Sequence, residues 1–345
     1  MKKAVILFNL GGPDSQESVE PFLFNLFYDP EILSLPKILR YPIAKIISKK
    51  RKPTAQKIYS EIGGSSPILK LTNDQSKALE NKLNENINKD IYKCFVVMRC
   101  WHPRASQVVN LVKDYNADEI ILLPLYPQYS SATSGSSIKE WLEVSKKNKI
   151  NKPTKIICCY PTDDNFIIAH TKLIKETIQN LNSYKLIFSA HGLPERNIKK
   201  GDPYQWQVEQ SVNKIIEKLN INNLDWILSY QSRVGPLKWI GPSTDNEIIN
   251  ASKKNKTILL VPIAFVSEHS ETLVELDIEY KKLAIENGCK NYYRVPALGT
   301  NKDFINSLYK LIINTNLSSS SQSGYFSPKN KCPNNFKKCP CSVTI

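Results

Sequence analysis

The stretch that decides the predicted fold is Tyr184-Lys185-Leu186-Ile187-Phe188-Ser189-Ala190-His191-Gly192-Leu193-Pro194. Its first half is a short apolar run, which is typical of a strand buried in a parallel sheet. Gly192 and Pro194 then end the strand, because glycine permits a positive φ and proline cannot donate to a sheet ladder. The pattern places His191 at the carboxyl end of a buried strand, where open α/β sheets bind ligands. A structural histidine in the core is the alternative interpretation.

The same strand pattern recurs along the 345 residues of the chain. Short apolar runs predict strands at 3–10, 92–99, 119–124, 155–160, 226–230, 257–262 and 292–295, with helices between them. Two successive sets predict an α/β fold with two Rossmann-like domains, each on a parallel four-stranded sheet, and a ligand cleft between the domains. The N-terminal domain is predicted at 1–160, completed by a helix at 302–313. The C-terminal domain is predicted at 161–301, and a linker and cysteine-rich tail at 314–345.

Charge is the most unusual feature of the composition. The chain carries 47 Lys and Arg against 32 Asp and Glu, a net charge of +15. Such an excess favours nucleic acid, acidic lipid or a carboxylate-bearing ligand as partner, although most of the lysines are expected to be ordinary solvated surface. The apolar run after Met1-Lys2-Lys3 is too short for a signal peptide. The sequence also contains no run of about 18 apolar residues, the length that a membrane span requires. We therefore expect a cytoplasmic protein.

Two segments of the N-terminal half suggest contacts with a ligand or a surface. Residues 22–43 are rich in aromatic and aliphatic side chains and are interrupted by prolines, which a single buried helix would not need. They predict an apolar lip over a flat ligand or a membrane-touching patch, with an ordinary helix pair as the alternative. A basic run at 45–52 suits anionic headgroups or a ligand carboxylate. The hydroxyl-rich loop 126–137 follows a strand and predicts polar ligand contacts.

Four glutamates, Glu268, Glu271, Glu275 and Glu279, are spaced by three or four residues and are predicted to share one helix face. Like charges at this spacing repel, which favours a role with a cation or a proton over an ordinary solvated face. With His191 at another strand end, Glu271 suits a weakly bound divalent metal or a base with a proton exit route. The sequence lacks the G-x-S-x-G motif of triad hydrolases and the G-x-G-x-x-G motif of dinucleotide sites.

Several motifs, in order along the chain, resemble those of the ferrochelatase family. They are Leu10-Gly11-Gly12-Pro13, Ile62-Gly63-Gly64-Ser65-Ser66-Pro67-Ile68, Tyr126-Pro127-Gln128-Tyr129-Ser130, Ser189-Ala190-His191-Gly192-Leu193-Pro194, Gln231-Ser232-Arg233-Val234-Gly235-Pro236, Gly241-Pro242-Ser243-Thr244-Asp245 and Phe265-Val266-Ser267-Glu268-His269-Ser270-Glu271-Thr272-Leu273. Each motif alone is weak, but the ordered set is specific and covers about residues 3–312. The resemblance implies a lyase of two Rossmann-like halves that inserts Fe²⁺ into protoporphyrin IX, the terminal step of haem biosynthesis, and releases two protons.

The resemblance also implies roles for individual residues. His191 matches the family's essential histidine, which abstracts pyrrole protons or binds the metal, and Glu271 matches the carboxylate across the macrocycle. Glu268, His269 and Glu275 match an acidic path for metal or protons behind this pair. The residues that match porphyrin contacts are Arg51, Tyr59, Ser66, Arg99, Tyr129 and Trp239. The positions that depart from the family pattern are Cys100, Tyr230 and Asn246.

The implied partners are protoporphyrin IX and Fe²⁺, with no nucleic acid. Residues 22–43 match the family's lip, which covers the porphyrin and touches the membrane. The implied location is therefore the cytoplasm, with peripheral contact at the anionic surface of the inner membrane.

Three of the eight cysteines, Cys332, Cys339 and Cys341, lie at the end of the chain. Their spacing resembles family members that hold a 2Fe–2S cluster, which needs four thiolates. The resemblance implies that the fourth comes from Cys158 or Cys159, with Cys158 preferred. A zinc knuckle or reduced thiols without a metal are the alternatives.

Other functions stay open at this stage. A tetrapyrrole carrier would bind porphyrin without turnover, and an oxidoreductase would bind a nicotinamide or flavin, which the missing glycine motif disfavours. Among chelatases, a coproporphyrin substrate or a different metal is an alternative. The sequence does not fix the metal, the porphyrin side chains or the oligomeric state.

Overall fold

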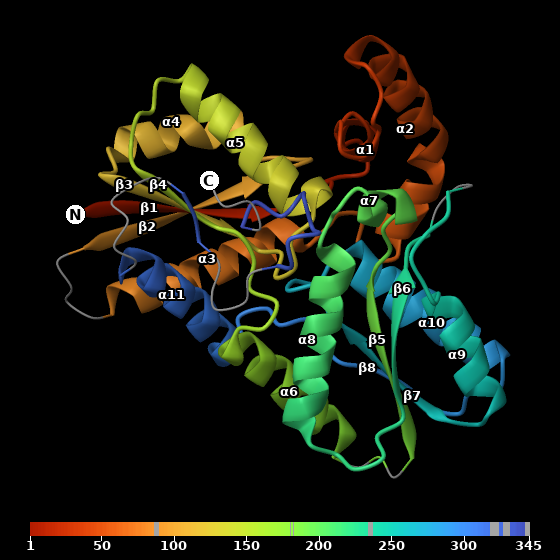
Figure 1. Ribbon diagram of the computed structural model, residues 1–345. Helices are drawn as coiled ribbons and strands as arrows, with labels where there is room; N and C mark the ends of the chain where they lie inside the picture. The colour runs from red at the N-terminus through yellow and green to blue at the C-terminus, as the bar shows by residue number, and fades with distance from the viewer. Residues whose placement is uncertain are drawn as a thin grey trace. The chain divides into compact units, whose positions relative to one another are not determined.

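The computed structural model describes residues 1–85, 90–179, 181, 183–233, 237–317, 324–326 and 332–341. The chain divides into two compact units (Figure 1). The first contains Met1–Cys159 and Leu308–Ser327, and the second contains Tyr160–Ser307 and Pro328–Ile345. Helix α11 (Lys302–Leu317) begins among residues of the second unit and ends among residues of the first.

The first unit is built on a parallel sheet with the strand order β2-β1-β3-β4-β9. Its strands are β1 (Lys2–Asn9), β2 (Ile91–Met98), β3 (Glu119–Pro124), β4 (Thr154–Ile157) and β9 (Gly324–Phe326). Its helices are α1 (Val19–Phe27), α2 (Lys37–Ser60), α3 (Ile68–Asn84), α4 (Ala105–Tyr115), the π-helix η1 (Ser131–Gly135) and α5 (Ser136–Lys147). Figure 1 shows α4 and α5 on one side of the sheet and α3 and α11 on the other. Helices on both faces explain why β1 reads as a continuous apolar run.

Four strands of this sheet form the predicted parallel arrangement, and β9 adds a short fifth strand. β9 and the end of α11 lie within the stretch that composition indicated to be a linker. β9 is three residues long and pairs with β4 through its backbone, with Ile157 opposite Phe326. Backbone pairing of so short a segment leaves no side-chain periodicity, so the sequence analysis missed it.

Pro30 and Pro36 of the lip segment lie between α1 and α2, but Pro42 does not interrupt the chain in the way we expected. Helix α2 continues through Pro42 and Pro53, although each proline removes one backbone donor. Packing between α1 and α2 offsets this loss: the Phe24 ring lies 5.3 Å from the Tyr41 ring, and Lys52 pairs with Glu20 at 3.1 Å. Tertiary contacts therefore override the local preference of proline.

The second unit is built on a parallel sheet with the order β6-β5-β7-β8. Its strands are β5 (Tyr184–His191), β6 (Trp226–Gln231), β7 (Thr257–Pro262) and β8 (Tyr292–Arg294). Its helices are α6 (Asp164–Ile178), α7 (Glu195–Lys199), α8 (Tyr204–Leu219), α9 (Thr244–Lys253), the π-helix η2 (Glu271–Glu279) and α10 (Tyr280–Glu286). Figure 1 shows α6 and α8 on one side of this sheet and α9 and α10 on the other.

The centre of the second unit is β5, and its burial follows the predicted pattern. Residues 186–190 are fully buried, and His191 is the last residue of the strand, as predicted. In the parallel register His191 lies opposite Gln231 of β6, and Ser189 lies opposite Pro262 of β7. The carboxyl ends of three strands therefore meet at one edge of the sheet, and the loops that leave them carry the candidate site.

Candidate active site

The site is built around a contact between two strand ends of the second unit. His191 closes β5, and Glu271 begins η2 in the segment that follows β7. The Nδ1 atom of His191 and the Oε2 atom of Glu271 are 2.8 Å apart. The imidazole is 41% exposed and the carboxylate 24% exposed, so one side of the pair is shielded and the other is accessible. The structure thus brings together the two residues that the sequence analysis placed at the reaction centre.

The pair shifts the proton affinity of both of its members. Burial alone would lower the pKa of His191, but the charge and hydrogen bond of Glu271 outweigh it and raise the pKa above its ordinary value of 6.5. Burial would raise the pKa of Glu271, yet the charge and hydrogen bond of His191 lower it to about 2. An ionised carboxylate therefore faces an imidazole that binds protons more tightly than a histidine in water.

Glu275 lies one helical step beyond Glu271 and shares its donors. The Ser232 hydroxyl lies 3.1 Å from Oε2 of Glu271 and 2.5 Å from Oε2 of Glu275, and the Ser232 N–H donates to Oε1 of Glu275 at 2.9 Å. Burial and the charge of Glu271 raise the pKa of Glu275. The serine is held in the left-handed region at φ 58°, which turns both its N–H and its hydroxyl toward the carboxylates.

A buried polar network beneath the pair fixes the orientation of Gln231. The Ser189 hydroxyl donates to Oε1 of Gln231 at 2.6 Å and lies 2.9 Å from the hydroxyl of Thr244. Because the amide oxygen accepts this bond, the amide nitrogen faces the carboxylates, 3.2 Å from Glu275 and 3.4 Å from Glu271. Gln231 thus supplies a donor that stabilises the negative charge of both carboxylates.

Glu268 does not join the other glutamates as the predicted helix face required. It precedes η2, and its Oε1 accepts from Arg294 and from the N–H of Ala297, each at 2.8 Å. Burial would raise the pKa of Glu268, but the Arg294 charge and these hydrogen bonds lower it. The helix begins only at Glu271, so Glu268 lies outside it and does not share a helix face with the other glutamates.

His269 lies close to the pair but has a different character. Its Nε2 is 3.9 Å from Oε1 of Glu271, and its ring centroid is 4.7 Å from that of Phe265. Burial lowers the pKa of His269 below 6.5 and outweighs the two nearby carboxylates. Burial therefore weakens proton binding at His269, whereas Glu271 strengthens it at His191. Among the residues that the structure describes, no third His, Cys, Asp or Glu joins His191 and Glu271 in an arrangement that could hold a metal ion.

Trp239 lies beside Gly192, the residue after His191, in the second unit. A Cβ placed on Gly192 would lie 3.2 Å from the Trp239 ring and 2.8 Å from the carbonyl oxygen of Gln231. Gly192 does not have the positive φ that we expected, and glycine is needed there for close approach instead. A backbone bridge between Pro194 and Trp239 fixes the indole next to the strand end.

Arg99, a predicted porphyrin contact in the first unit, takes part in a buried ion network. Its guanidinium lies 2.8 Å from Asp29 and 3.5 Å from Glu140, and its Nε donates to the Ser136 hydroxyl at 2.7 Å. Arg104 also pairs with Glu140. This arginine connects the ends of α1 and β2 with the start of α5, a structural role that the sequence analysis did not foresee.

The other predicted porphyrin contacts also lie in the first unit. Tyr59 is buried in a cluster with aromatic and aliphatic side chains of α1, and Tyr129 is 6% exposed. Ser66 accepts from the N–H of Ile68 at 3.4 Å, and the guanidinium of Arg51 lies 5.9 Å from the Phe27 ring centroid. These residues are therefore largely packed within their own unit.

The predicted lip exposes several large apolar side chains along α2. Ile38 is 86% exposed and Ile46 is 66% exposed, and Leu39 and Tyr41 are each more than half exposed. The basic run from Lys45 to Lys52 lies on the same helix. Among the described residues, no helix is long and apolar enough to cross a membrane.

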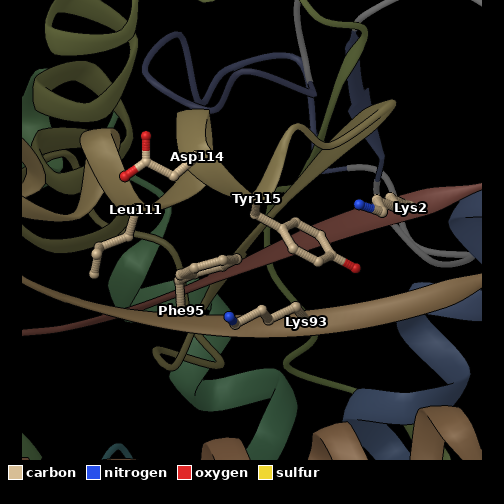
Figure 2. Close-up of a pocket in the computed structure, with 6 residues that line it drawn as sticks. All are labelled: Lys2, Lys93, Phe95, Leu111, Asp114 and Tyr115. Carbon is tan, nitrogen blue, oxygen red and sulfur yellow. The ribbon is translucent and has the colours of Figure 1, made fainter.

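A shallow hollow of about 520 Å³ in the first unit contains none of the predicted site residues (Figure 2). It is lined by Lys2, Lys93, Phe95, Leu111, Asp114 and Tyr115. Each lysine ammonium lies 5.5 Å from the centroid of the Tyr115 ring. Both lysines of the hollow are therefore engaged in cation–π contacts with the Tyr115 ring.

Two of the tail cysteines are buried in the second unit. Cys332 and Cys339 are 4% and 1% exposed, and the side-chain amide of Gln207 in α8 lies 3.1 Å from the sulfur of Cys332. Cys158 and Cys159 are buried in the first unit, directly after β4. The expectation of a strand through residue 160 was therefore too long, because β4 ends at Ile157.

The sequence analysis gave no role to several residues that shape the site. Gln231 and Ser232 stood in a quoted motif, but their hydrogen bonds to the glutamates depend on strand register and a left-handed backbone. Arg294 comes from β8, which is the farthest strand of the sheet from β6. The sequence offered one signal for these residues: Gln231 and Ser232 are two polar residues directly after a predicted strand, where ligand sites are common.

Comparisons with known proteins identify the family of the chain. The family model described as ferrochelatase matches residues 2–316. A ferrochelatase of Pelagibacter ubique (strain HTCC1062) is 70% identical over 341 residues, which cover 99% of each chain. A ferrochelatase of Rickettsia prowazekii (strain Madrid E) is 52% identical and covers 99% of this chain and 98% of its own length.

A solved structure, SirB from Bacillus subtilis with Fe³⁺, has a TM-score of 0.56 at 13% identity and covers 93% of this chain and 98% of its own. This likeness confirms the predicted chelatase fold with its two parallel sheets. The match over residues 2–316 and the full-length relatives together show that the chain belongs to the ferrochelatase family, the lyases that insert iron into protoporphyrin in haem synthesis.

Proposed function

We propose that this chain inserts Fe²⁺ into protoporphyrin IX, with His191 accepting the pyrrole protons and Glu271 stabilising the charge that results. The observation that carries the assignment is the 2.8 Å contact between Nδ1 of His191 and Oε2 of Glu271 at a strand end. Because Nδ1 faces the carboxylate, Nε2 is the nitrogen left to meet a substrate. Family membership supports the reaction class, and the accessible imidazole supports its role as base.

Proton removal follows from the charges around the histidine. Neutral His191 accepts a pyrrole proton at Nε2 and becomes an imidazolium, which the ionised Glu271 stabilises through Nδ1–H. Glu271 stays ionised, and the Ser232 hydroxyl, which contacts both Glu271 and Glu275, connects the two carboxylates. A raised pKa makes Glu275 the better proton acceptor of the two carboxylates. The exposed imidazole then releases its Nε2 proton to solvent, so that His191 again presents a neutral Nε2 to the second pyrrole N–H.

We propose that the macrocycle binds through the residues that match the family's porphyrin contacts. Arg51, Tyr59, Ser66, Arg99, Tyr129 and Trp239 are the proposed porphyrin contacts. A metal reaches the pyrrole nitrogens only when the ring is bent, and binding of a large apolar face can supply the roughly 1–5 kcal/mol that such strain requires. Trp239 lies against Gly192, the residue that follows His191 in the chain. Iron is a substrate of the reaction, and His191 and Glu271 are the proposed ligands of the Fe²⁺ ion while it is inserted into the porphyrin.

Replacing His191 by alanine should abolish metal insertion while porphyrin binding persists. Loss of a general base costs roughly 10²–10⁴-fold in rate. The measurement is anaerobic insertion of Fe²⁺ and Zn²⁺ into protoporphyrin and coproporphyrin, followed by absorbance, with porphyrin binding followed by fluorescence. His102→Ala, at an exposed histidine, is the control. A folded His191→Ala protein that inserts metal at the normal rate would contradict the role. A wild-type protein that binds porphyrin without inserting metal would point to a carrier.

Replacing Glu271 by glutamine should shift the acid limb of the pH profile. In the wild type, Glu271 raises the pKa of His191, so the neutral base forms, and kcat/KM rises, only above the ordinary value of 6.5. Without the carboxylate charge, burial lowers this pKa, and the limb should move to lower pH while the maximal rate falls. Glu279→Gln, in the same helix but exposed, should leave the limb in place. An unmoved limb in Glu271→Gln would rule out the proposed coupling.

We propose that the exposed apolar side chains of α2, with the basic run beside them, touch an anionic membrane surface from the cytoplasmic side. An amphipathic surface of this kind combines buried apolar area with attraction to anionic lipid. The double change of Ile38 and Ile46 to serine should weaken binding to vesicles that contain phosphatidylglycerol, measured by co-sedimentation. Ile91→Ser, at a residue 61% exposed on β2, is a matched control. If Ile91→Ser weakened vesicle binding as much as the double variant did, a specific contact through α2 would be excluded.

We propose that Cys332, Cys339, Cys341 and Cys158 hold a 2Fe–2S cluster. Cys332, Cys339 and Cys158 are buried thiols, and an amide lies 3.1 Å from the Cys332 sulfur, but among the described residues no three His, Cys, Asp or Glu side chains form a group that could hold a metal ion. A bound cluster would supply redox-active iron at these thiolates, and no step of the insertion reaction depends on it here.

The cysteine assignment separates two neighbouring residues. Cys158→Ser should remove the visible charge-transfer bands and the acid-labile sulfide of anaerobically purified protein, and Cys159→Ser should retain both. Retention of the bands in Cys158→Ser with loss in Cys159→Ser would exchange the two assignments. Absence of iron and sulfide from the wild type would reject the cluster, and bound zinc in its place would support a knuckle.

A further inference from the structure

The cysteine tail is docked on the segment that precedes and begins α8. The N–H of Lys338 donates to the carbonyl oxygen of Gly201 at 3.1 Å, and the Phe336 ring lies 5.7 Å from that of Trp206. The Gln207 amide lies 3.1 Å from the Cys332 sulfur. Backbone, ring and side-chain contacts thus join residues 332–339 to residues 201–207.

Gly201 is the position where this docking is tightest. A Cβ placed there would lie 2.8 Å from the backbone nitrogen of Lys337, closer than packed atoms allow. The glycine also has φ +88°, in the left-handed region that side chains disfavour. The tail backbone therefore occupies the space that a side chain at position 201 would fill.

The same segment contacts the base on its other side. The Tyr204 hydroxyl donates to the backbone carbonyl oxygen of His191 at 3.1 Å. Tyr204 is 7% exposed, and its own N–H donates to Oδ1 of the fully buried Asp202 at 3.1 Å. The first turn of α8 thus lies between the tail and the end of β5, with hydrogen bonds on both sides.

We propose that Tyr204 is a positioning residue for His191 and that the docked tail holds Tyr204 in place. The inference goes beyond the proposed function but rests on it for its activity readout. A base must stay within about 0.5 Å of its working position, so a hydrogen bond to its own backbone matters at the end of a strand. Displacing the tail moves residues 201–207, and Tyr204 then releases the His191 carbonyl.

The test displaces the tail without changing the active site or a cysteine. Gly201→Ala places a methyl group against Lys337, and Phe336→Ala removes the ring that packs on Trp206. Gly288→Ala is the matched control, because Gly288 has φ +92° with no atom near its Cβ position. The control carries the same backbone strain in the same unit but meets no tail.

We expect Gly201→Ala and Phe336→Ala each to lower kcat roughly tenfold, with the KM for protoporphyrin unchanged. Tyr204→Phe should lower kcat to a similar extent. In the Tyr204→Phe background the tail variants should cause no further loss, because the contact through which they act is gone. Gly288→Ala should retain the wild-type kcat. Additive losses in the double variants would overturn the inference, as would a normal kcat in tail variants whose tail has become sensitive to protease.

A spectroscopic readout tests the inference independently of catalysis. The chain has only four histidines, so the imidazole signals of the full-length protein can be assigned by NMR. The His191 signal should shift in Gly201→Ala, Phe336→Ala and Tyr204→Phe and stay in place in Gly288→Ala. An unmoved His191 signal in all three variants would overturn the inference even if kcat fell. If the wild type inserts no metal, the proposed function fails, while the NMR result still decides whether the tail acts on His191.

Discussion

The hydrogen bond between His191 and Glu271 is the interaction on which the rest of the site depends. It keeps a shielded carboxylate ionised, with its pKa near 2, and it raises the pKa of the imidazole. Burial, together with the fixed negative charge of Glu271, makes a second carboxylate resist ionisation, which is why the pKa of Glu275 is raised. One pair therefore creates three different proton affinities within a few ångströms: a base, a permanent anion and an acceptor that can hold a proton.

The scaffold supplies what this arrangement needs. Parallel strands bring His191 and Gln231 to one edge of the sheet, opposite each other in register. The Ser189 hydroxyl, which also contacts the Thr244 hydroxyl, donates to the amide oxygen of Gln231. The amide nitrogen of Gln231 therefore faces the carboxylates. Ser232 adopts a left-handed conformation that costs about 1–3 kcal/mol for a residue of this kind. Three contacts from Ser232 to Glu271 and Glu275 explain why this strain is retained.

Much of this could be predicted from the sequence, because the decisive signals were local. The apolar run before His191 and the break after it located the strand end, and the repeated pattern gave the parallel sheets. The rest depended on tertiary structure. Neither the left-handed Ser232 nor the partnership of Arg294 with Glu268 has a signature in residue spacing. Glu268 was grouped with Glu271 because helix periodicity was extended one turn too early, and β9 is too short to show any periodicity.

The contrast between Glu268 and Glu275 shows how neighbouring residues of one type acquire different functions. Both are shielded, and both follow the same strand. Arg294 neutralises Glu268 through a 2.8 Å ion pair and lowers its pKa, so its charge is fixed near neutral pH. Glu275 receives only hydroxyl, amide and N–H donors, with Tyr280 adding a hydroxyl at 3.0 Å, and no cation is among these partners. Neutral donors satisfy a carboxylate without fixing its charge. The acidic segment therefore holds two kinds of carboxylate: Glu268, a structural anion that ties the residues before η2 to β8, and Glu275, whose protonation can change beside the base.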